Sequence, residues 1–151
     1  MALLEIGSQA PDFTLPSSEG KDVSLKSFEG KVVVLYFYPK DFTPGCTKEA
    51  CSFRDSFQLF KDKGIEVLGV SYDPVARHEK FKAKYSLPFT LLTDVDKSVS
   101  KKYGAEGVLT SKRVTYVIGK DGKIIAVFPK VNVSAHAQEV LEVINKYSTT
   151  P

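Results

Sequence analysis

The sequence lacks tryptophan, contains a single methionine, and has only two cysteines and two histidines among its 151 residues. Two cysteines are too few for the disulfide framework of a small secreted domain, which usually carries about four or more. A structural zinc site needs about four Cys or His ligands. His78 and His136 have no cysteine near them in the sequence. We therefore expect neither a disulfide scaffold nor a metal site.

Long apolar runs are also missing. The longest, Val32 to Tyr38, is far shorter than the roughly 18 residues that a membrane-spanning helix needs. The first residues contain neither a basic segment nor the apolar stretch of a secretory signal peptide. We therefore expect a cytoplasmic protein with no membrane partner, although the mature form of an organellar protein would look the same.

The charge pattern excludes another class of partner. The net charge is +3, and the lysines are scattered rather than gathered in a basic block, so we expect no nucleic-acid binding. The positive balance leaves room for a weakly acidic partner protein. With 42% hydrophobic and 26% charged residues, the chain has the composition of a soluble globular protein, and its length predicts one domain over residues 1–151.

The order of the predicted elements indicates an α/β fold with a mixed central sheet flanked by helices. Two short alternating segments near the N-terminus predict a β-hairpin, and the continuous run Val32–Tyr38 predicts a strand buried on both faces. The expected strands are 13–15, 22–25, 32–38, 65–70, 89–92, 114–118 and 124–128, and the expected helices are 44–63, 73–85, 95–103 and 135–147.

Several residues are typical of helix ends. Thr43 suits the N-cap of the first long helix, and Pro44 suits its first position. Gly64 is a plausible C-cap of the same helix. Ser134 is expected to cap the last helix.

The most informative stretch joins the buried strand to this first helix. The strand ends at Pro39, a Pro/Gly loop follows, and Cys46 comes in the first helical turn. A helix N-terminus stabilises an anion, and a thiolate is such an anion, so we expect Cys46 to be reactive. An ordinary buried thiol is the alternative for both cysteines, because free cysteine is among the most buried residue types. Cys51, beside Ala50 and Phe53, would by itself be interpreted as a core residue.

At this stretch the sequence resembles a known family. Pro39, Thr43 and Cys46 reproduce the spacing of the peroxiredoxin active-site motif, and the longer run FYPKDFTPGCTKEAC, from Phe37 to Cys51, resembles the peroxiredoxin Q or bacterioferritin comigratory protein subfamily. The resemblance covers nearly the whole chain. Further matches are Gly7-x-x-Ala10-Pro11-Asp12-Phe13, Gly69-Val70-Ser71 and Arg113-x-Thr115-x-Val117-Ile118.

The resemblance implies a thioredoxin-like fold and a thiol peroxidase. Cys46 would be the peroxidatic cysteine, attacking the O–O bond of a hydroperoxide to give a sulfenic acid. Cys51 would be the resolving cysteine, forming an intramolecular disulfide that a thioredoxin- or glutaredoxin-type reductant reopens. This chemistry needs no metal and no organic cofactor. Because both cysteines lie in one segment, resolution needs no second subunit, and we expect a monomer.

Five further residues are candidates for the site, and each also has a simpler structural explanation. Thr43 can place its hydroxyl against the thiolate and the peroxide oxygen, or merely cap the helix. Pro39 can shield the pocket from water, or merely end the strand. Arg113 can stabilise the thiolate and the charge developing on oxygen, or be a surface charge at the rim. Glu49 can orient Arg113, or be an exposed helical residue. Gly45 can allow the backbone to approach the substrate, or be a simple loop glycine.

Two other functions remain open on a fold of this kind. A disulfide oxidoreductase would use a Cys-x-x-Cys motif, whereas here four residues separate the cysteines. A non-enzymatic, holdase-type binding protein predicts unreactive thiols.

Helix geometry adds an expectation about the redox cycle. Residues five apart on an α-helix have Cα atoms roughly 8.6 Å apart, whereas a disulfide requires about 4.4–6.8 Å. A helix that is intact from Pro44 through Cys51 therefore cannot hold a Cys46–Cys51 bond. We expect the helix in the reduced protein and an unwound first turn in the oxidised one.

Overall fold

A computed structural model describes residues 3–149. The elements in chain order are β1 (Thr14–Pro16), β2 (Asp22–Ser24), the 3-10 helix η1 (Leu25–Phe28), β3 (Val32–Phe37), α1 (Pro44–Asp55), α2 (Phe57–Asp62), β4 (Ile65–Ser71), α3 (Val75–Tyr85), β5 (Thr90–Thr93), α4 (Ser98–Lys102), β6 (Val114–Ile118), β7 (Ile124–Phe128) and α5 (His136–Thr149). The predicted α/β class is confirmed.

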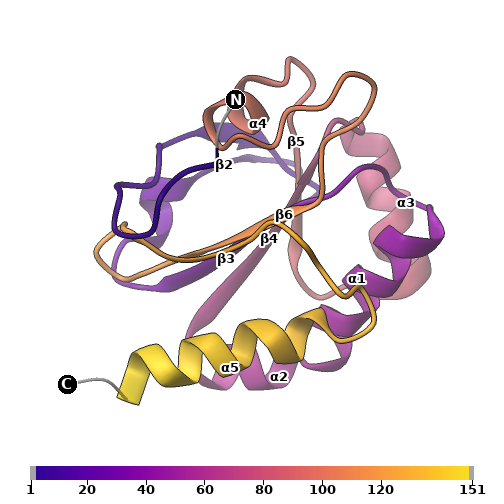
Figure 1. Cartoon of the computed structure of the whole chain (residues 1–151). Helices are drawn as coiled ribbons and strands as arrows, with labels where there is room; N and C mark the ends of the chain where they lie inside the picture. The colour runs from indigo at the N-terminus through magenta and orange to yellow at the C-terminus, as the bar shows by residue number, and fades with distance from the viewer. Residues whose placement is uncertain (1–2, 150–151) are drawn as a thin grey trace.

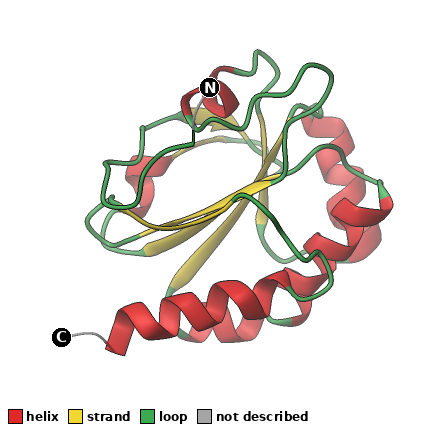
Figure 2. Cartoon of the chain, in the orientation of Figure 1, coloured by secondary structure: helices red, strands yellow, loops and turns green. Residues whose placement is uncertain are grey.

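The central sheet has five strands in the order β5-β4-β3-β6-β7. β3 and β4 run parallel, as do β4 and β5, whereas β6 is antiparallel to both β3 and β7. The predicted mixed sheet is therefore correct. β1 and β2 form the predicted N-terminal hairpin as a separate antiparallel pair. Figures 1 and 2 show the sheet between two groups of covering elements, with α5 and α2 along one side and α4 on the other.

β3 is the centre of the fold. All six of its residues are buried, as the continuous apolar run predicts. Val34 and Tyr36 belong to the core that α1, α2, α3 and α5 cover. Leu35 and Phe37 belong to the opposite core, which the N-terminal segment and the region around α4 cover. The side chains alternate because successive residues of a strand point to opposite faces.

Two predicted helices have different bounds in the structure. The helix expected over residues 44–63 is divided at Ser56, whose φ and ψ of −104° and 6° leave the helical range. Ser56 N–H still donates to Ser52 O at 3.3 Å. The helical spacing of the apolar residues therefore continues across this position, and the sequence pattern does not reveal the kink. The helix expected over 95–103 is shorter, because the Asp94 carboxylate accepts the N–H groups of Val99 and Ser100 and the helix begins only at Ser98.

Smaller differences occur elsewhere. Ser134 does not cap the last helix, because α5 begins at His136 and Ala135 precedes it. η1 was not expected, since four residues are too few to show a helical period. Gly64 has φ +70° and follows Lys63, the C-cap residue of α2, in keeping with its predicted place at the helix end.

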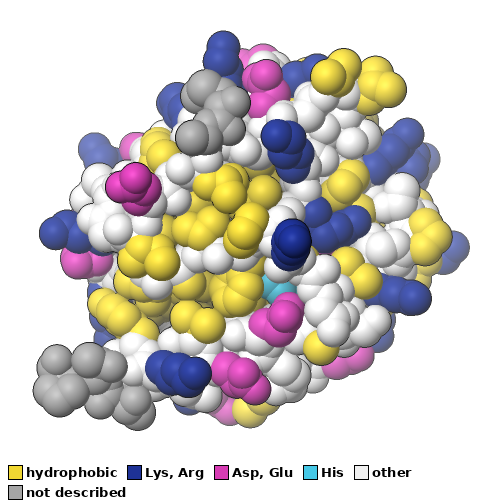
Figure 3. All heavy atoms as spheres, viewed as in Figure 1, with side chains coloured by type: hydrophobic (Ala, Val, Ile, Leu, Met, Phe, Trp, Pro, Cys, Tyr) yellow, Lys and Arg dark blue, Asp and Glu magenta, His cyan; other side chains and the backbone are white. Residues whose placement is uncertain are grey.

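The surface agrees with the charge pattern of the sequence. Figure 3 shows lysine and arginine side chains spread over the visible face and around its outline. Within residues 3–149, no helix has both the length and the apolar character needed to cross a bilayer.

Candidate active site

Cys46 lies in the first turn of α1, directly beyond the carboxyl end of β3. α1 begins at Pro44, so Cys46 is its third residue. The first backbone N–H groups of a helix have no partner within it and carry the positive end of its dipole. Cys46 is only 1% exposed, Cys51 is half-buried in the same helix, and both thiols are free. The predicted continuous helix through both cysteines is confirmed.

Arg113 reaches Cys46 because of the sheet topology. It precedes β6, and the antiparallel pairing of Phe37 with Val114 puts this end of β6 beside the end of β3. Arg113 Nη2 donates to Cys46 Sγ at 3.3 Å, and Nη1 donates to Glu49 Oε1 at 2.7 Å. One guanidinium thus joins the thiol to a buried carboxylate on the next turn of α1.

The charges around Arg113 keep it positive. Burial tends to lower the pKa of Arg113, but Glu49 and Cys46 outweigh it and raise the pKa above its ordinary value. Arg113 therefore remains a cation, with one N–H directed at sulfur. Hydrogen bonds in which one partner is charged are stronger than neutral ones, so Arg113 is a strong donor to the Cys46 sulfur.

Gly45 makes room for this guanidinium. A Cβ atom at position 45 would lie 3.1 Å from Arg113 Nη2, closer than ordinary van der Waals contact. The expectation for Gly45 was a close approach of the backbone to substrate. The structure adds that a side chain here would crowd the Arg113 guanidinium, and the approach of the backbone to substrate stays a prediction.

Thr43 and Pro39 lie in the loop between β3 and α1. Thr43 is at the N-cap position, but its hydroxyl makes no capping hydrogen bond and instead donates to Lys40 O at 2.7 Å. The expectation of a side-chain cap is therefore wrong. The Thr43 oxygen keeps lone pairs that can accept a hydrogen bond. Pro39 is half-buried, at the bend that follows β3.

Glu49 is fully buried rather than exposed on the helix. Burial raises its pKa to about 7, and Arg113 opposes the rise. Its Oε1 binds Arg113, whereas Oε2 has no hydrogen-bond partner among the described residues. His136 Nε2 lies 3.9 Å from Oε2 and 2.7 Å from Thr115 Oγ1. Burial also lowers the pKa of His136. Sequence reasoning missed His136, because α5 meets α1 only through tertiary packing.

Replacing Glu49 by glutamine should change how stability depends on pH. A carboxyl group whose pKa is 4.5 in the unfolded chain and about 7 in the folded protein stabilises the fold below about pH 4.5 and loses that contribution as the pH rises through about 7. Between pH 5 and pH 8, the unfolding free energy of Glu49→Gln should therefore gain up to about 3 kcal/mol on wild type. Urea unfolding at the two pH values measures it. The lowered pKa of His136 acts in the opposite direction but is common to both proteins, so a constant difference would contradict the assignment.

A second buried polar cluster lies beneath the loop that precedes α1. Asp41, Asp73 and His78 are all buried, with ligand-type atoms within 4.8 Å of one another. His78 Nδ1 and Asp41 Oδ2 are 2.7 Å apart. That is a hydrogen-bond length, whereas two ligands of a tetrahedral zinc at about 2.0 Å would be about 3.3 Å apart. We therefore interpret this cluster as a hydrogen-bond network.

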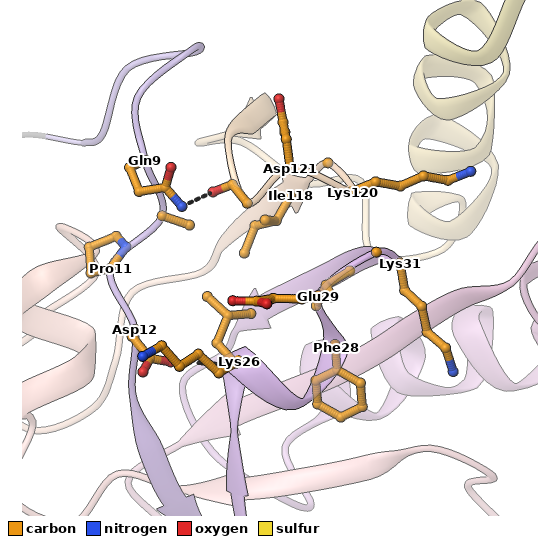
Figure 4. A pocket seen from close by; sticks show the side chains of 16 residues that line it. Gln9, Pro11, Asp12, Lys26, Phe28, Glu29, Lys31, Ile118, Lys120 and Asp121 are labelled. Atoms are coloured by element: carbon orange, nitrogen blue, oxygen red, sulfur yellow. Dashed lines mark hydrogen bonds between the residues drawn. The ribbon is translucent and has the colours of Figure 1, made fainter.

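The structure also has a hollow of about 610 Å³, which does not belong to the cysteine site. Figure 4 shows it among the N-terminal segment, η1 and the β6–β7 turn. It contains Lys31 and Val33, at the start of β3, whereas Cys46 follows the end of that strand. Its walls carry three lysines and three carboxylates, so it has no marked preference for either sign of charge.

Comparison with known proteins identifies the family of the chain. A model of the AhpC/TSA family matches residues 6–127. The chain belongs to this family. A Coxiella burnetii protein named as a bcp-type peroxiredoxin is 49% identical over 149 residues, which are 91% of this chain and 97% of the relative. The chloroplastic peroxiredoxin Q of Oryza sativa subsp. japonica is 46% identical over 142 residues, 91% of this chain but 65% of the rice protein.

A solved structure is similar over the full length. The bacterioferritin comigratory protein of Xanthomonas campestris, described for its alkyl peroxide reduction activity, has a TM-score of 0.88 and 32% identity, covering 99% of this chain and 100% of that one. This peroxiredoxin therefore has a thioredoxin-like fold and is a thiol peroxidase. The prediction of the subfamily is confirmed, and a disulfide oxidoreductase or holdase is disfavoured.

Proposed function

We propose that Cys46 reduces hydrogen peroxide and organic hydroperoxides, and that Cys51 resolves the product. The observation that carries the proposal is the 3.3 Å contact of Arg113 Nη2 with Cys46 Sγ in the first turn of α1. The guanidinium and the helix N-terminus both stabilise the attacking thiolate and the negative charge that develops on oxygen. The alkyl peroxide activity attributed to the Xanthomonas relative supports the organic part of the substrate range.

The reaction balances without a cofactor. The Cys46 thiolate attacks one peroxide oxygen, the O–O bond breaks, and the departing alkoxide takes up a proton to leave as an alcohol, or as water from hydrogen peroxide. Cys46 is now a sulfenic acid. Cys51 attacks Cys46 Sγ, a disulfide forms, and water leaves. A dithiol of the thioredoxin type then reduces the disulfide and is itself oxidised.

Thr43, Pro39, Glu49 and Gly45 have supporting roles in this scheme. The Thr43 hydroxyl accepts a hydrogen bond from the incoming hydroperoxide, and Pro39 shields the loop from water. Glu49 holds Arg113 in place, and Gly45 leaves it space. The 3.1 Å approach at Gly45 and the 2.7 Å ion pair at Glu49 support these assignments.

The remaining properties follow from the disulfide. Because Cys46 and Cys51 are in one helix, one copy of the chain completes the cycle, and we propose a monomer acting as one domain. Both thiols must be reduced again after each turnover, which requires a reducing compartment. The cytoplasm meets this requirement, as does an organelle such as the one for which the rice relative is named.

Replacing Cys51 by serine tests the scheme. In an assay with thioredoxin, thioredoxin reductase and NADPH, wild type should consume NADPH when hydrogen peroxide or cumene hydroperoxide is added, and Cys51→Ser should lose sustained turnover. The variant should still react once, leaving a sulfenic acid on Cys46 that dimedone traps for mass spectrometry. The chain has only two cysteines, so unchanged turnover would mean that the reductant attacks the sulfenic acid directly and would contradict the intramolecular disulfide.

A further inference from the structure

The loop between β3 and α1 is held by a buried network centred on Asp41. All four polar atoms of this residue are engaged. Its N–H donates to Asp73 Oδ2 at 2.9 Å, and its carbonyl accepts from Arg77 Nη2 at 3.2 Å. Its carboxylate accepts from the Tyr38 hydroxyl at 2.6 Å and meets His78 Nδ1 at 2.7 Å. Asp41 is 0% exposed, so each lost contact would leave a buried polar group without a partner.

Both ring nitrogens of His78 have polar partners. Nε2 lies 3.0 Å from Leu92 O, and a carbonyl oxygen only accepts, so Nε2 carries a hydrogen. Nδ1 faces Asp41 Oδ2 at 2.7 Å, and a hydrogen bond there requires one more proton between nitrogen and oxygen. A hydrogen bond between His78 Nδ1 and Asp41 Oδ2 therefore joins α3 to the loop.

The loop needs this support because its backbone is strained. Phe42 has φ +68°, a left-handed conformation that is costly for a bulky residue and persists only where the surroundings enforce it. Its ring packs against Phe81 at 5.1 Å between centroids, and the Arg77 guanidinium lies 5.1 Å above it. Residues of α3 thus contact both Asp41 and Phe42.

We propose that Asp41 and His78 are positioning residues for the peroxide reaction, an inference that rests on the proposed role of Cys46. α1 begins at Pro44, so the loop decides where its first turn starts and where Sγ lies relative to Arg113. Among the described residues, neither side chain forms a hydrogen bond or ion pair with the Cys46 thiol or with Arg113, so both act through the loop. A misplacement of about 1 Å in an active site can cost on the order of 100-fold in rate.

Matched pairs of variants separate the effect of losing hydrogen bonds from the effect of losing side-chain volume. Asp41→Asn keeps the network, because its amide donates to neutral His78 and its carbonyl oxygen still accepts from Tyr38, whereas Asp41→Ala removes these contacts. His78→Asn keeps a donor toward Asp41, and His78→Leu does not. Tyr116→Phe is the control, since it removes a buried hydroxyl that donates to Tyr103 O in the core on the opposite face of the sheet.

The experiment measures the second-order rate constant of Cys46 oxidation by hydrogen peroxide, by rapid quench and mass spectrometry, together with the unfolding free energy of each variant. Asp41→Ala and His78→Leu should lose about 100-fold in rate. Asp41→Asn and His78→Asn should recover most of that loss, and Tyr116→Phe should lose stability alone. If Asp41→Ala does not fold, the comparison of His78→Asn with His78→Leu tests the inference.

Two outcomes would overturn the inference. One is that Asp41→Ala and His78→Leu slow the reaction no more than Tyr116→Phe does. The other is that the asparagine variants are as slow as Asp41→Ala and His78→Leu. An unreactive Cys46 in wild type would instead refute the proposed function, so the two failures are distinguishable.

Discussion

Cys46→Ser is expected to lose peroxide reduction almost completely, to below a few per cent of wild type. A serine hydroxyl remains protonated beside Arg113, because neither the guanidinium nor the helix N-terminus makes it acidic enough to ionise near neutral pH. Sulfur is also the only atom at this position that can form the disulfide with Cys51. The measurement is NADPH consumption with a thioredoxin system and excess hydrogen peroxide.

The interpretation of Cys46→Ser needs a folded protein. Cys46 is in the core beside Ala50 and Phe53, so circular dichroism and urea unfolding should accompany the assay. Cys51→Ser is the matched control, because it makes the same chemical change five residues along the same helix and should still react once. Substantial turnover by folded Cys46→Ser would disprove the assignment of the nucleophile.

Arg113→Met should slow the reaction of Cys46 with peroxide by about 100- to 1,000-fold, the usual cost of removing one donor to a developing anion. Methionine fills similar volume but gives up the Nη2 contact to sulfur at 3.3 Å. The thiolate then loses its nearest cation, so the pH at which Cys46 is half-maximally alkylated by iodoacetamide should move upward. Rapid-quench kinetics and the pH profile of alkylation measure the two effects.

Arg113→Met also leaves Glu49 buried without its cation. The double variant Arg113→Met/Glu49→Gln removes that uncompensated carboxylate and should regain stability but not rate. Arg113→Lys keeps a positive charge but cannot bind Cys46 and Glu49 through one planar group, so its rate should fall between those of wild type and Arg113→Met. An unchanged rate and an unchanged pH profile in Arg113→Met would make Arg113 an ordinary rim charge.

The sequence predicted local features better than contacts between distant elements. β3 and α1 were predictable because their apolar patterns and the Pro44 start lie within a few residues. Arg113 was identified only through the motif, because its contact with Cys46 depends on the pairing of β3 with β6. His78 and His136 gave no signal, since their partners Asp41 and Glu49 are reached only after α3 and α5 pack on the sheet.

The burial of Cys46 also has a consequence for the order in which partners meet the protein. At 1% exposure, the sulfur is closed to the active site of another protein in this conformation. In the proposed cycle, a reductant reaches it only after oxidation has unwound the start of α1. The proposed cycle therefore gives the enzyme two conformations in turn, one that reacts with a hydroperoxide and one that meets a protein reductant. In this cycle, a cellular dithiol is oxidised only by an enzyme molecule that has already reduced a peroxide.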